Sequence, residues 1–449
     1  MSNQTICFFP IVRYQAELFC KLASMMLSAG IINKVLFICP SVSSFEYVKN
    51  KYPCYLTADL LAQIDVSNDN QDYNDETGGF NLFELKKFKV EKEYLSENKG
   101  QKPENICREA RHFIKIWDRF LDDHEVDNLF VWNGYIVPQE TMIACAAHRG
   151  TKILFFENGY ESNTFVMDEL GINAKSGLKE RLSTAGSVAT KVSKVGQTPS
   201  VSPKDRLMSY LLLRLKLQWY KFKYHNTSSL RYEFSQPIHS KLIQLFDKIL
   251  HSESLTPKEP YVFFPLQVIG DSQLIENSIH DQAEVVKKIA SLISQVNTER
   301  VQPIQFVIKE HPRQNTRRYL KELKQQIKSP NVIFTRFANT NRLIKNATAV
   351  TTINSSVGYQ ALKVKKNVFV LGDSIYEGPG LGEKIKEINE LKIKLLQIVD
   401  KGIIFTDTNK VDEFVVQYQS ECYPLNFNHQ AKDEILNNII SLVDKGEST

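Results

Sequence analysis

The sequence predicts an α/β protein of two Rossmann-like domains, and three observations point to this fold class. Short apolar runs alternate with helix-like segments in both halves of the chain, which is the rhythm of a parallel sheet covered by helices. Several of these runs end abruptly in polar residues, as strands do at the carboxyl edge of an open sheet. The length of 449 residues also exceeds what one hydrophobic core usually supports.

The N-terminal half contains four expected strands. Gly30 ends the first helical pattern, and Pro40 stops the strand that follows it. A later strand ends at Asn133 and Gly134, and a short helix leads from there to an apolar run that stops at Glu157. The expected strands span residues 6–12, 35–39, 128–132 and 152–156, and the expected helices span residues 14–29, 108–122 and 139–147.

The C-terminal half repeats the alternation. Pro312 lies just beyond one apolar run, where a central strand must already have ended. β-branched residues fill another run at residues 349–353, as is usual in strands. The expected strands span residues 261–264, 304–308, 331–334, 349–353 and 367–371, and the expected helices span residues 280–296, 341–347 and 431–443.

Four segments fall outside this alternation. Residues 67–79 are rich in Asn, Asp and Gly and predict a loop. Residues 85–102 are rich in Lys and Glu and predict either a solvated helix or an excursion away from the core. Residues 176–202, rich in Ser, Thr and Gly, predict a flexible connection. We therefore expect an N-terminal domain of residues 1–200, a connecting segment of residues 201–236 and a C-terminal domain of residues 237–449.

The fourth segment, residues 207–224, interleaves apolar and aromatic residues with cations. A helix of this composition can lie in a membrane interface, burying Leu213, Leu217 and Tyr220 while its cations meet lipid phosphates. It suits an interdomain helix with snorkelling lysines equally well. The cations concerned are Arg206, Arg214, Lys216, Lys221 and Lys223.

Composition narrows the class of protein. Hydrophobic residues make up 42% and charged residues 24% of the chain, as in an ordinary globular protein. A net charge of +5 is too small for a dedicated nucleic-acid binder, so we expect no nucleic-acid partner. Seven scattered cysteines without a C-x-x-C motif favour a reducing compartment and argue against structural zinc. With no signal peptide and no apolar stretch of membrane-spanning length, we expect a cytoplasmic protein whose membrane contact is at most peripheral.

Charged groups follow the run at residues 304–308. Lys309, Glu310, His311 and Arg313 come directly after this apolar stretch, so a parallel strand would deliver them to the ligand-binding edge of the sheet. The alternative is a surface loop in which these charges are solvated.

A second candidate group lies around Glu157. This carboxylate ends a buried run and is followed by Asn158, Gly159 and Tyr160. Partial burial at a strand end moves a carboxyl pKa toward the working pH, as an acid/base catalyst requires. The alternative is that Glu157 caps the next helix.

A third group follows residues 261–264. Gln267 precedes a flexible turn at Gly270, and Asp271 and Ser272 come just before the next helix. Asp271 is a candidate nucleophile or base because it lies beside the end of a strand. An Asp-Ser pair at this position is also a common helix N-cap.

A strand-turn-helix at residues 349–362 predicts an anion site. Asn354, Ser355 and Ser356 follow the strand, and Gly358 lies in the first turn of the helix. Backbone N–H groups at a helix start, helped by two hydroxyls, bind phosphate without a cation. The alternative is an ordinary serine N-cap.

Several of these motifs in order resemble the capsule polysaccharide biosynthesis family. The resemblance covers roughly residues 131–380, and its form around Glu157 is similar to the KpsS-like branch of bacterial β-Kdo glycosyltransferases rather than the duplicated KpsC-like one. The motifs are FENGY at residues 156–160, GIN at 171–173, PLQVIGDSQ at 265–273, KEHP at 309–312, TINSSVG at 352–358 and LG at 371–372.

The resemblance implies a GT-B-like glycosyltransferase with its two domains facing a cleft. The N-terminal domain would be the acceptor side, and the C-terminal domain would bind the nucleotide sugar, CMP-Kdo. The acceptor would be a lyso-phospholipid or a growing oligo-Kdo linker. The family pattern further implies retention of configuration, Asp271 as nucleophile and Glu157 as acid/base.

The resemblance also implies the remaining site residues. His311 and Ser355 would contact the CMP moiety. The other expected donor-binding residues are Gln267, Ser272, Lys309, Asn354, Ser356, Gly358 and Gln360, and the expected acceptor-side residues are Asn133, Asn158, Gly159 and Tyr160.

One residue departs from the family pattern. Gln360 stands where the family often has a glutamate, and its amide can still hydrogen-bond a ribose hydroxyl. No Asp-x-Asp motif occurs in the matched blocks, so we expect no cofactor and no metal. Expected partners are the donor, the acceptor, the inner membrane surface and capsule assembly or export proteins. A nucleotide-sugar epimerase on the same scaffold and a non-enzymatic assembly or export factor remain alternatives.

Overall fold

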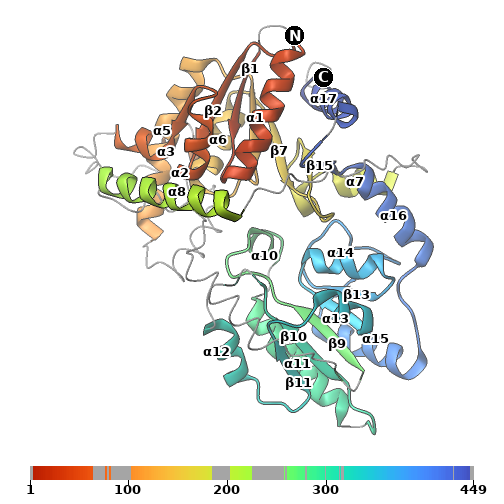
Figure 1. Cartoon of the computed structure of the whole chain (residues 1–449). Helices are drawn as coiled ribbons and strands as arrows, with labels where there is room; N and C mark the ends of the chain where they lie inside the picture. Colours follow the sequence, from red (N-terminus) through yellow and green to blue (C-terminus); the bar gives the residue numbers. More distant parts are fainter. Residues whose placement is uncertain are drawn as a thin grey trace. The chain divides into compact units, whose positions relative to one another are not determined.

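The protein consists of two compact units, described here from a computed structural model (Figure 1). The first unit comprises residues 1–177, 192–235 and 422–449, and the second comprises residues 178–191 and 236–421. This division differs from the expected boundaries, because the C-terminal segment returns to the first unit. The structure describes residues 4–63, 76–77, 80–81, 103–184, 203–224, 257, 260–278, 281–298, 300–312, 314, 318–427 and 429–444.

The first unit is built on a seven-stranded sheet in the order β15-β8-β7-β6-β1-β2-β3. Its strands β3, β2, β1, β6 and β7 run parallel, whereas β8 and β15 extend the sheet in antiparallel fashion. The strands are β1 (Thr5–Phe9), β2 (Lys34–Cys39), β3 (Cys54–Leu56), β6 (Asn128–Trp132), β7 (Lys152–Asn158), β8 (Thr164–Asp168) and β15 (Tyr423–Pro424).

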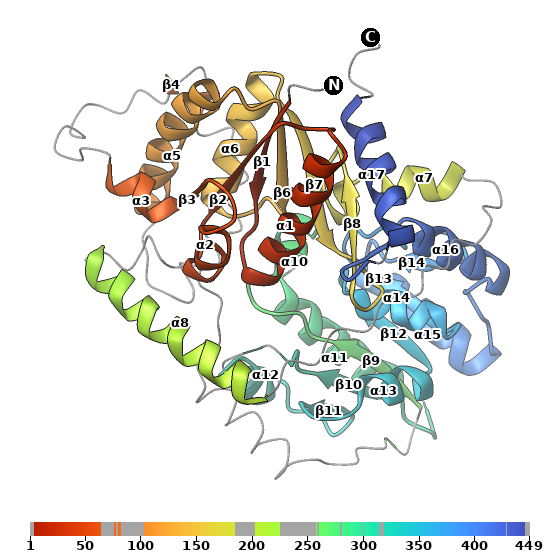
Figure 2. The same ribbon diagram turned by 45° about the horizontal axis from the view of Figure 1, so that its top comes forward.

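Helices cover both faces of this sheet. Side chains alternate along β1, so Ile6 and Phe8 join one core while Cys7 and Phe9 join the other. Figure 2 shows α1 and α17 on one face and α5 and α6 on the other. The helices are α1 (Arg13–Ser28), α2 (Val42–Val48), α3 (Thr57–Ala62), α5 (Pro103–His124), α6 (Val137–His148), η3 (Asn173–Lys175), α8 (Pro203–Lys223) and α17 (His429–Asp444); a two-stranded ribbon joins β4 (Glu76–Thr77) and β5 (Phe80–Asn81).

The second unit is built on a six-stranded, entirely parallel sheet in the order β11-β10-β9-β12-β13-β14. Its strands are β9 (Tyr261–Pro265), β10 (Gln305–Lys309), β11 (Val332–Thr335), β12 (Ala349–Thr352), β13 (Asn367–Val370) and β14 (Gly382–Lys384). Its helices are α7 (Leu178–Thr184), α10 (Ser272–Glu276), α11 (Gln282–Asn297), α12 (Arg318–Gln326), α13 (Thr340–Asn346), α14 (Ser356–Lys363), α15 (Ile388–Lys401) and α16 (Thr408–Ser420).

The predicted α/β class is confirmed, with a largely parallel sheet in the first unit and an entirely parallel sheet in the second. Strand β9 lies between β10 and β12, so the loops that follow these three strands leave neighbouring strands at one edge of the second sheet. The expectations for residues 85–102, for all but two residues of 67–79 and for most of 176–202 lie outside the described residues. The described start of residues 176–202 contains the helix α7, so the expected flexible connection is wrong for this part.

The expected basic aromatic segment is a helix, α8, that docks on the first unit. Leu217 and Tyr220, both buried, pack against Val42 and Leu56. They therefore face protein, and the expectation that they enter a membrane is wrong. In the described part of the chain, no helix has the length and apolar character needed to cross a membrane.

Candidate functional site

The carboxyl end of β10 carries the charged residues that the sequence singled out. Lys309 is the last residue of the strand and is only 6% exposed. Burial lowers the pKa of its ammonium group, and the nearby Glu310 partly offsets this. His311 is half-buried, and Arg313 lies outside the described residues. The solvated-loop alternative is therefore wrong for Lys309 and Glu310.

Glu310 holds this edge of the sheet together. Its carboxylate, 1% exposed, pairs with Arg336 at 3.2 Å between Oε2 and Nε. Arg336 also donates to the carbonyl oxygen of Gln314 at 3.3 Å, and the side chain of Gln314 accepts from the backbone N–H of Ile269 at 3.1 Å. The loops after β9 and β10 are thus fixed to each other. Sequence reasoning gave no role to Arg336 or Gln314.

Gln267 and Asn354 tie the loop after β9 to the loop after β12. The Gln267 Nε2 atom donates to Asn354 Oδ1 at 3.0 Å, and Asn354 Nδ2 donates to the carbonyl oxygen of Gln273 at 2.7 Å. Both side chains are buried. In this structure they position the loops, and their contact with a donor stays a prediction.

Asp271 is the N-cap of α10, so the capping alternative is confirmed. Its carboxylate accepts the backbone N–H of Gln273 at 2.9 Å. Burial raises the pKa of Asp271, while hydrogen bonds from the Gln273 backbone and the Gln267 side chain oppose this rise. Ser272, the first residue of the helix, is half-buried. A carboxylate that caps a helix can still interact with a second partner through its oxygen atoms. A chemical role for Asp271 therefore stays a prediction.

The start of α14 has the expected strand-turn-helix form. Ser355 is its N-cap, with Oγ accepting from the backbone N–H of Val357 at 3.3 Å. Ser356 begins the helix, and Gln360 lies about one turn further on; both are half-buried. The serine N-cap alternative is therefore confirmed, and such a cap is compatible with anion binding by the same helix start.

Packing requires a glycine at position 358, for a reason that the sequence analysis missed. A Cβ atom at this position would lie 2.5 Å from the hydroxyl oxygen of Tyr376. That hydroxyl donates to the carbonyl oxygen of Ser355 at 2.6 Å. Gly358 is therefore needed for Tyr376 to pack on the helix start, and close approach of a phosphate is not required to explain it.

In the first unit, Glu157 is held by two asparagines. Asn133 donates from Nδ2 to Glu157 Oε2 at 2.7 Å, and the backbone N–H of Asn158 donates to Oε1 at 2.7 Å. Asn133 follows β6, the parallel neighbour of β7, and its left-handed backbone (φ 71°) turns the chain there. Glu157 lies within β7, which is followed along the chain by β8, so the alternative that it caps a helix is wrong.

The turn after Glu157 requires a glycine at position 159. A Cβ atom there would lie 2.3 Å from Thr164 Oγ1, and the Gly159 N–H donates to the carbonyl oxygen of Thr164 at 3.0 Å. The glycine is needed to close the hairpin between β7 and β8. Tyr160, next in this turn, is half-buried.

Two residues at the start of α1 complete this cluster and were missed. The hydroxyl of Tyr14 is within hydrogen-bonding distance of Asn158 Oδ1 at 3.2 Å and accepts from Asn158 Nδ2 at 3.1 Å. Gln15 accepts from the backbone N–H of Ile11 at 2.7 Å and donates to Tyr14 at 3.3 Å. Their position directly after the first strand was the available signal.

A small cavity adjoins the same cluster. It has a volume of about 80 Å³ and is lined by Asn133, Tyr135, Glu140 and Lys175 among others. Glu140 is only 2% exposed, and the Lys175 ammonium lies 5.6 Å from the centre of the Tyr135 ring. Both charged groups thus reach a space next to the asparagine that holds Glu157.

The expected site residues form two clusters, one in each unit. Glu157, Asn133 and Asn158 share direct hydrogen bonds in the first unit. Asp271, Gln267 and Asn354 are linked in the second. Within the described residues, no group of three or more His, Cys, Asp or Glu side chains is arranged to hold a metal ion.

The chain is similar to known proteins over the stretch that contains the expected site residues. The family described as "Capsule polysaccharide biosynthesis protein" matches residues 131–392, more than half of the chain. Protein FixF of Sinorhizobium fredii is 29% identical over 260 residues, which cover 57% of this chain and 51% of that protein. The chain thus matches about half the length of this curated relative.

The chain also resembles solved structures. KpsC of Thermosulfurimonas dismutans, a beta Kdo 2,4 transferase, is 14% identical with a TM-score of 0.38, covering 65% of this chain and 79% of that one. The UDP-GlcNAc 2-epimerase of Neisseria meningitidis is 12% identical with a TM-score of 0.32, covering 98% of this chain and 100% of that one. Likeness at this level does not distinguish between the two activities.

Proposed function

This chain belongs to the capsule polysaccharide biosynthesis family, and we propose that it is a glycosyltransferase that transfers Kdo from CMP-Kdo. The acceptor is a lyso-phospholipid or a growing oligo-Kdo linker. The observation that carries the proposal is the extent of the family match, because residues 131–392 contain Glu157, Asp271 and all the residues expected to bind the donor or the acceptor.

Glu157 serves as the acid/base in this proposal. N–H donors at both of its oxygens stabilise the ionised form, which is the form that accepts a proton. Its position at the carboxyl end of β7 leaves it half-buried. An acceptor hydroxyl that hydrogen-bonds this carboxylate loses its proton to it as the new glycosidic bond forms.

Asp271 serves as the nucleophile. Its carboxylate oxygen forms a bond to the anomeric carbon of Kdo as the bond to the phosphate oxygen breaks, and CMP leaves with the electron pair. The acceptor oxygen then displaces the carboxylate from the same carbon. Two successive inversions retain the configuration of the sugar.

The start of α14 binds the phosphate of CMP. Its first N–H groups carry the positive end of the helix dipole, and the half-buried Ser355 and Ser356 add hydroxyl donors. Lys309 and His311, at the end of β10, supply further donors to the nucleotide. These groups stabilise the leaving phosphate without a metal ion.

Mass spectrometry of the reaction products tests this function. The purified protein is incubated with freshly generated CMP-Kdo and lyso-phosphatidylglycerol, and we expect one or more Kdo residues to be added to the lipid. Asp271→Asn and Glu157→Gln should each lower the initial rate at least about 100-fold, as expected for a lost nucleophile or base.

A matched control separates chemistry from capping. Asp281 caps α11 by accepting the Glu284 N–H at 2.9 Å, as Asp271 caps α10. Asp281→Asn should leave transfer intact. Release of CMP without any sugar transfer would contradict the proposal and favour an epimerase. No turnover of CMP-Kdo by the unmodified chain would favour an assembly factor, and full transfer activity in both site variants would contradict the roles given to Asp271 and Glu157.

Contact with the inner membrane is a further part of the proposal, and α8 is the element that makes it. Its outward side exposes large apolar side chains at the spacing of one helical stripe, whereas Leu217 and Tyr220 pack on protein. Lipid-facing residues of this kind keep an enzyme near a lipid acceptor. The exposed residues are Leu211, Leu212, Leu215, Trp219 and Phe222.

A further inference from the structure

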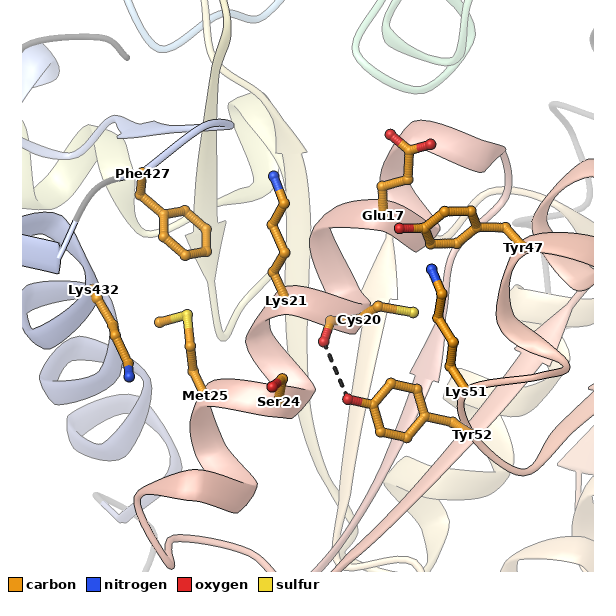
Figure 3. Close-up of a pocket in the computed structure, with 10 residues that line it drawn as sticks. All are labelled: Glu17, Cys20, Lys21, Ser24, Met25, Tyr47, Lys51, Tyr52, Phe427 and Lys432. Carbon is orange, nitrogen blue, oxygen red and sulfur yellow. Dashed lines mark hydrogen bonds between the residues drawn. The ribbon is translucent and has the colours of Figure 1, made fainter. Parts of the chain in front are cut away.

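A basic cavity in the first unit belongs to neither cluster described above. It has a volume of about 620 Å³ and lies between α1, the end of α2 with the residues that follow it, and the start of α17 with Phe427 before it (Figure 3). One side of α1, from Glu17 to Met25, forms one wall. The other walls are formed by Tyr47, Lys51, Tyr52, Phe427 and Lys432. We call this cavity the α1 groove.

The charge of the α1 groove is positive. Three lysines line it, Lys21, Lys51 and Lys432, against a single carboxylate, Glu17. That carboxylate is already paired with Arg13 at 2.9 Å between Oε1 and Nε. Like charges that share one cavity repel each other, and an anionic ligand relieves that repulsion. The groove is therefore suited to an anion.

Aromatic rings hold two of these lysines in place. The Lys51 ammonium lies 3.2 Å from the centre of the Tyr47 ring, and the Lys21 ammonium lies 6.0 Å from that of Phe427. Figure 3 shows Lys21 extending between Phe427 and Glu17. Lys21 also donates to Asn426 Oδ1 at 3.2 Å. Such contacts reduce the entropy lost when the lysines bind a ligand.

The same rings offer apolar surface beside the charges. Tyr47, Tyr52 and Phe427 line the groove, and aromatic faces pack well against the C–H groups of a sugar ring. A ligand that suits both features has apolar ring faces and regularly placed anionic groups. A saccharide whose residues each carry a carboxylate meets this description, whereas a small inorganic anion would use only the lysines.

The groove also lies on the helix that reaches the Glu157 cluster. Tyr14 at the start of α1 contacts Asn158, and Lys21 comes seven residues later. At the helical rise this separation is about 10 Å. A saccharide chain with its end at Glu157 can therefore extend along α1 into the groove.

We infer that the α1 groove binds the carboxylate-bearing saccharide chain behind the end that accepts the next sugar. This inference rests on the proposed function and deepens it by naming a second subsite for the acceptor. Lys21, Lys51 and Lys432 bind carboxylates of the chain, and Tyr47 and Phe427 pack on its rings.

Direct binding tests the groove without relying on catalysis. A tetramer of sialic acid, which carries one carboxylate per sugar, is titrated into the full chain by calorimetry, with neutral maltotetraose as the matched control. We expect the acidic tetramer to bind, more weakly at high salt, and maltotetraose not to bind. Equal binding of the two saccharides, or no binding of either, overturns the inference.

Variants of the groove lysines test whether the tetramer binds in the groove. Lys21→Gln/Lys51→Gln/Lys432→Gln should weaken tetramer binding at least about tenfold, and the single change Lys432→Gln should weaken it less, in a protein with unaltered thermal unfolding. Lys115→Gln, an exposed lysine on α5, should bind as the unmodified chain does. Unchanged binding in the triple variant contradicts the inference.

Two further arms separate this inference from its alternatives. Glu157→Gln should retain tetramer binding although it loses transfer, so failure of the proposed function and failure of the groove give different results. Inorganic phosphate and monomeric lyso-phosphatidylglycerol are titrated in parallel. Binding of either that is lost in the triple variant, without binding of the tetramer, would assign the groove to a phosphate group and overturn the saccharide assignment.

Discussion

Asp271 and Glu157 are both carboxylates near strand ends, but their surroundings differ. Burial raises the pKa of Asp271 against the opposing effect of two hydrogen bonds, whereas Glu157 receives N–H donors on both oxygens. The raised pKa means that Asp271 keeps its proton to a higher pH than an ordinary aspartate does. We therefore expect the acid limb of the transfer rate to lie above the range of an ordinary aspartate, because the nucleophile must be ionised.

Asp271→Asn should change how stability depends on pH. Asparagine caps helices as well as aspartate does, so α10 keeps its cap. With a folded pKa raised above 3.8, the folded state holds a proton that the unfolded state has already lost. The stability contributed by protonated Asp271 is full below pH 3.8 and is lost as the pH rises through the raised pKa.

Urea unfolding at a series of pH values measures this effect. As the pH rises from 3.8 through the raised pKa of Asp271, the stability of the unmodified chain should fall relative to that of Asp271→Asn. The Asp281→Asn variant serves as the control for replacing a capping aspartate. Parallel pH profiles for the unmodified chain and Asp271→Asn would show that Asp271 is not perturbed by burial.

The sequence allowed some of these residues to be grouped and not others. Asn133 follows β6 and Glu157 lies near the end of β7. Neighbouring parallel strands end at one edge of a sheet, so the proximity of these two residues could be expected. Tyr14 was missed because its contact with Asn158 depends on the angle at which α1 leaves β1. Tyr376 was missed because its contact with the α14 N-cap joins residues 21 positions apart.

At the scale of elements, ion pairs and hydrogen bonds attach one side of α8 to the first unit. Lys216 and Tyr220 bind Glu46, and Lys223 binds Asp59 at 2.7 Å, which fixes the helix to α2 and α3. Burial raises the pKa of Glu46, but hydrogen bonds from Lys216, Lys49 and Tyr220 outweigh it and hold the pKa below 4.5. The docking contribution of Glu46 is therefore present above pH 4.5 and is lost as the pH falls through the lowered value.

Replacing the outward residues of α8 should release the protein from membranes. Leu215→Ser/Trp219→Ser/Phe222→Ser should lower binding to phosphatidylglycerol vesicles at least about tenfold, because three side chains of about 1.5–3 kcal/mol each are removed. Vesicle sedimentation at neutral pH measures this. Thermal unfolding should be unchanged, since these side chains are 57–76% exposed.

Lysine variants provide the contrast for this experiment. Lys216→Gln and Lys223→Gln break the pairs with Glu46 and Asp59, so they are expected to loosen α8 from the first unit as well as change its charge. Lys221→Gln, on an exposed part of the helix, changes charge alone. If vesicle binding falls in the lysine variants but is unchanged in Leu215→Ser/Trp219→Ser/Phe222→Ser, that result would contradict an apolar membrane contact.

Elements with strong local patterns were predicted well. The run at residues 128–132 became β6 over the same residues, and the expected helix at 14–29 became α1 within one residue. Strand β8 was missed because a five-residue apolar run does not reveal that the chain returns antiparallel to β7. The sequence left the surroundings of α8 open between a membrane interface and a second domain, since composition does not show which side of a helix meets protein.

At the scale of the whole molecule, the chain returns to its first unit at the end. Strand β15 pairs with β8, and α17 buries Ile435, Leu436 and Ile439 in the same core as α1. No local signal marks this return, because an amphipathic helix has the same pattern wherever it packs. The expected boundary therefore left the C-terminal helix with the second domain.

Truncating one buried side chain of α17 tests this arrangement. Ile435 is fully buried, so Ile435→Ala should lower the free energy of unfolding by about 2–5 kcal/mol. Ile393 on α15 is 58% exposed, and Ile393→Ala should change it by less than about 0.5 kcal/mol. Calorimetry should show the loss in the transition of the first unit. A shift confined to the second unit would contradict the assignment of α17.

The central claim is that Asp271 forms a covalent bond to the transferred sugar, and intact-protein mass spectrometry tests it most directly. Glu157→Gln slows the second displacement, so this variant incubated with CMP-Kdo alone should accumulate an adduct of one Kdo residue. Peptide mapping should place the adduct on Asp271, and Glu157→Gln/Asp271→Asn should form none. Transfer by the unmodified protein together with an adduct on another residue, or with an adduct that persists in the double variant, would contradict the account.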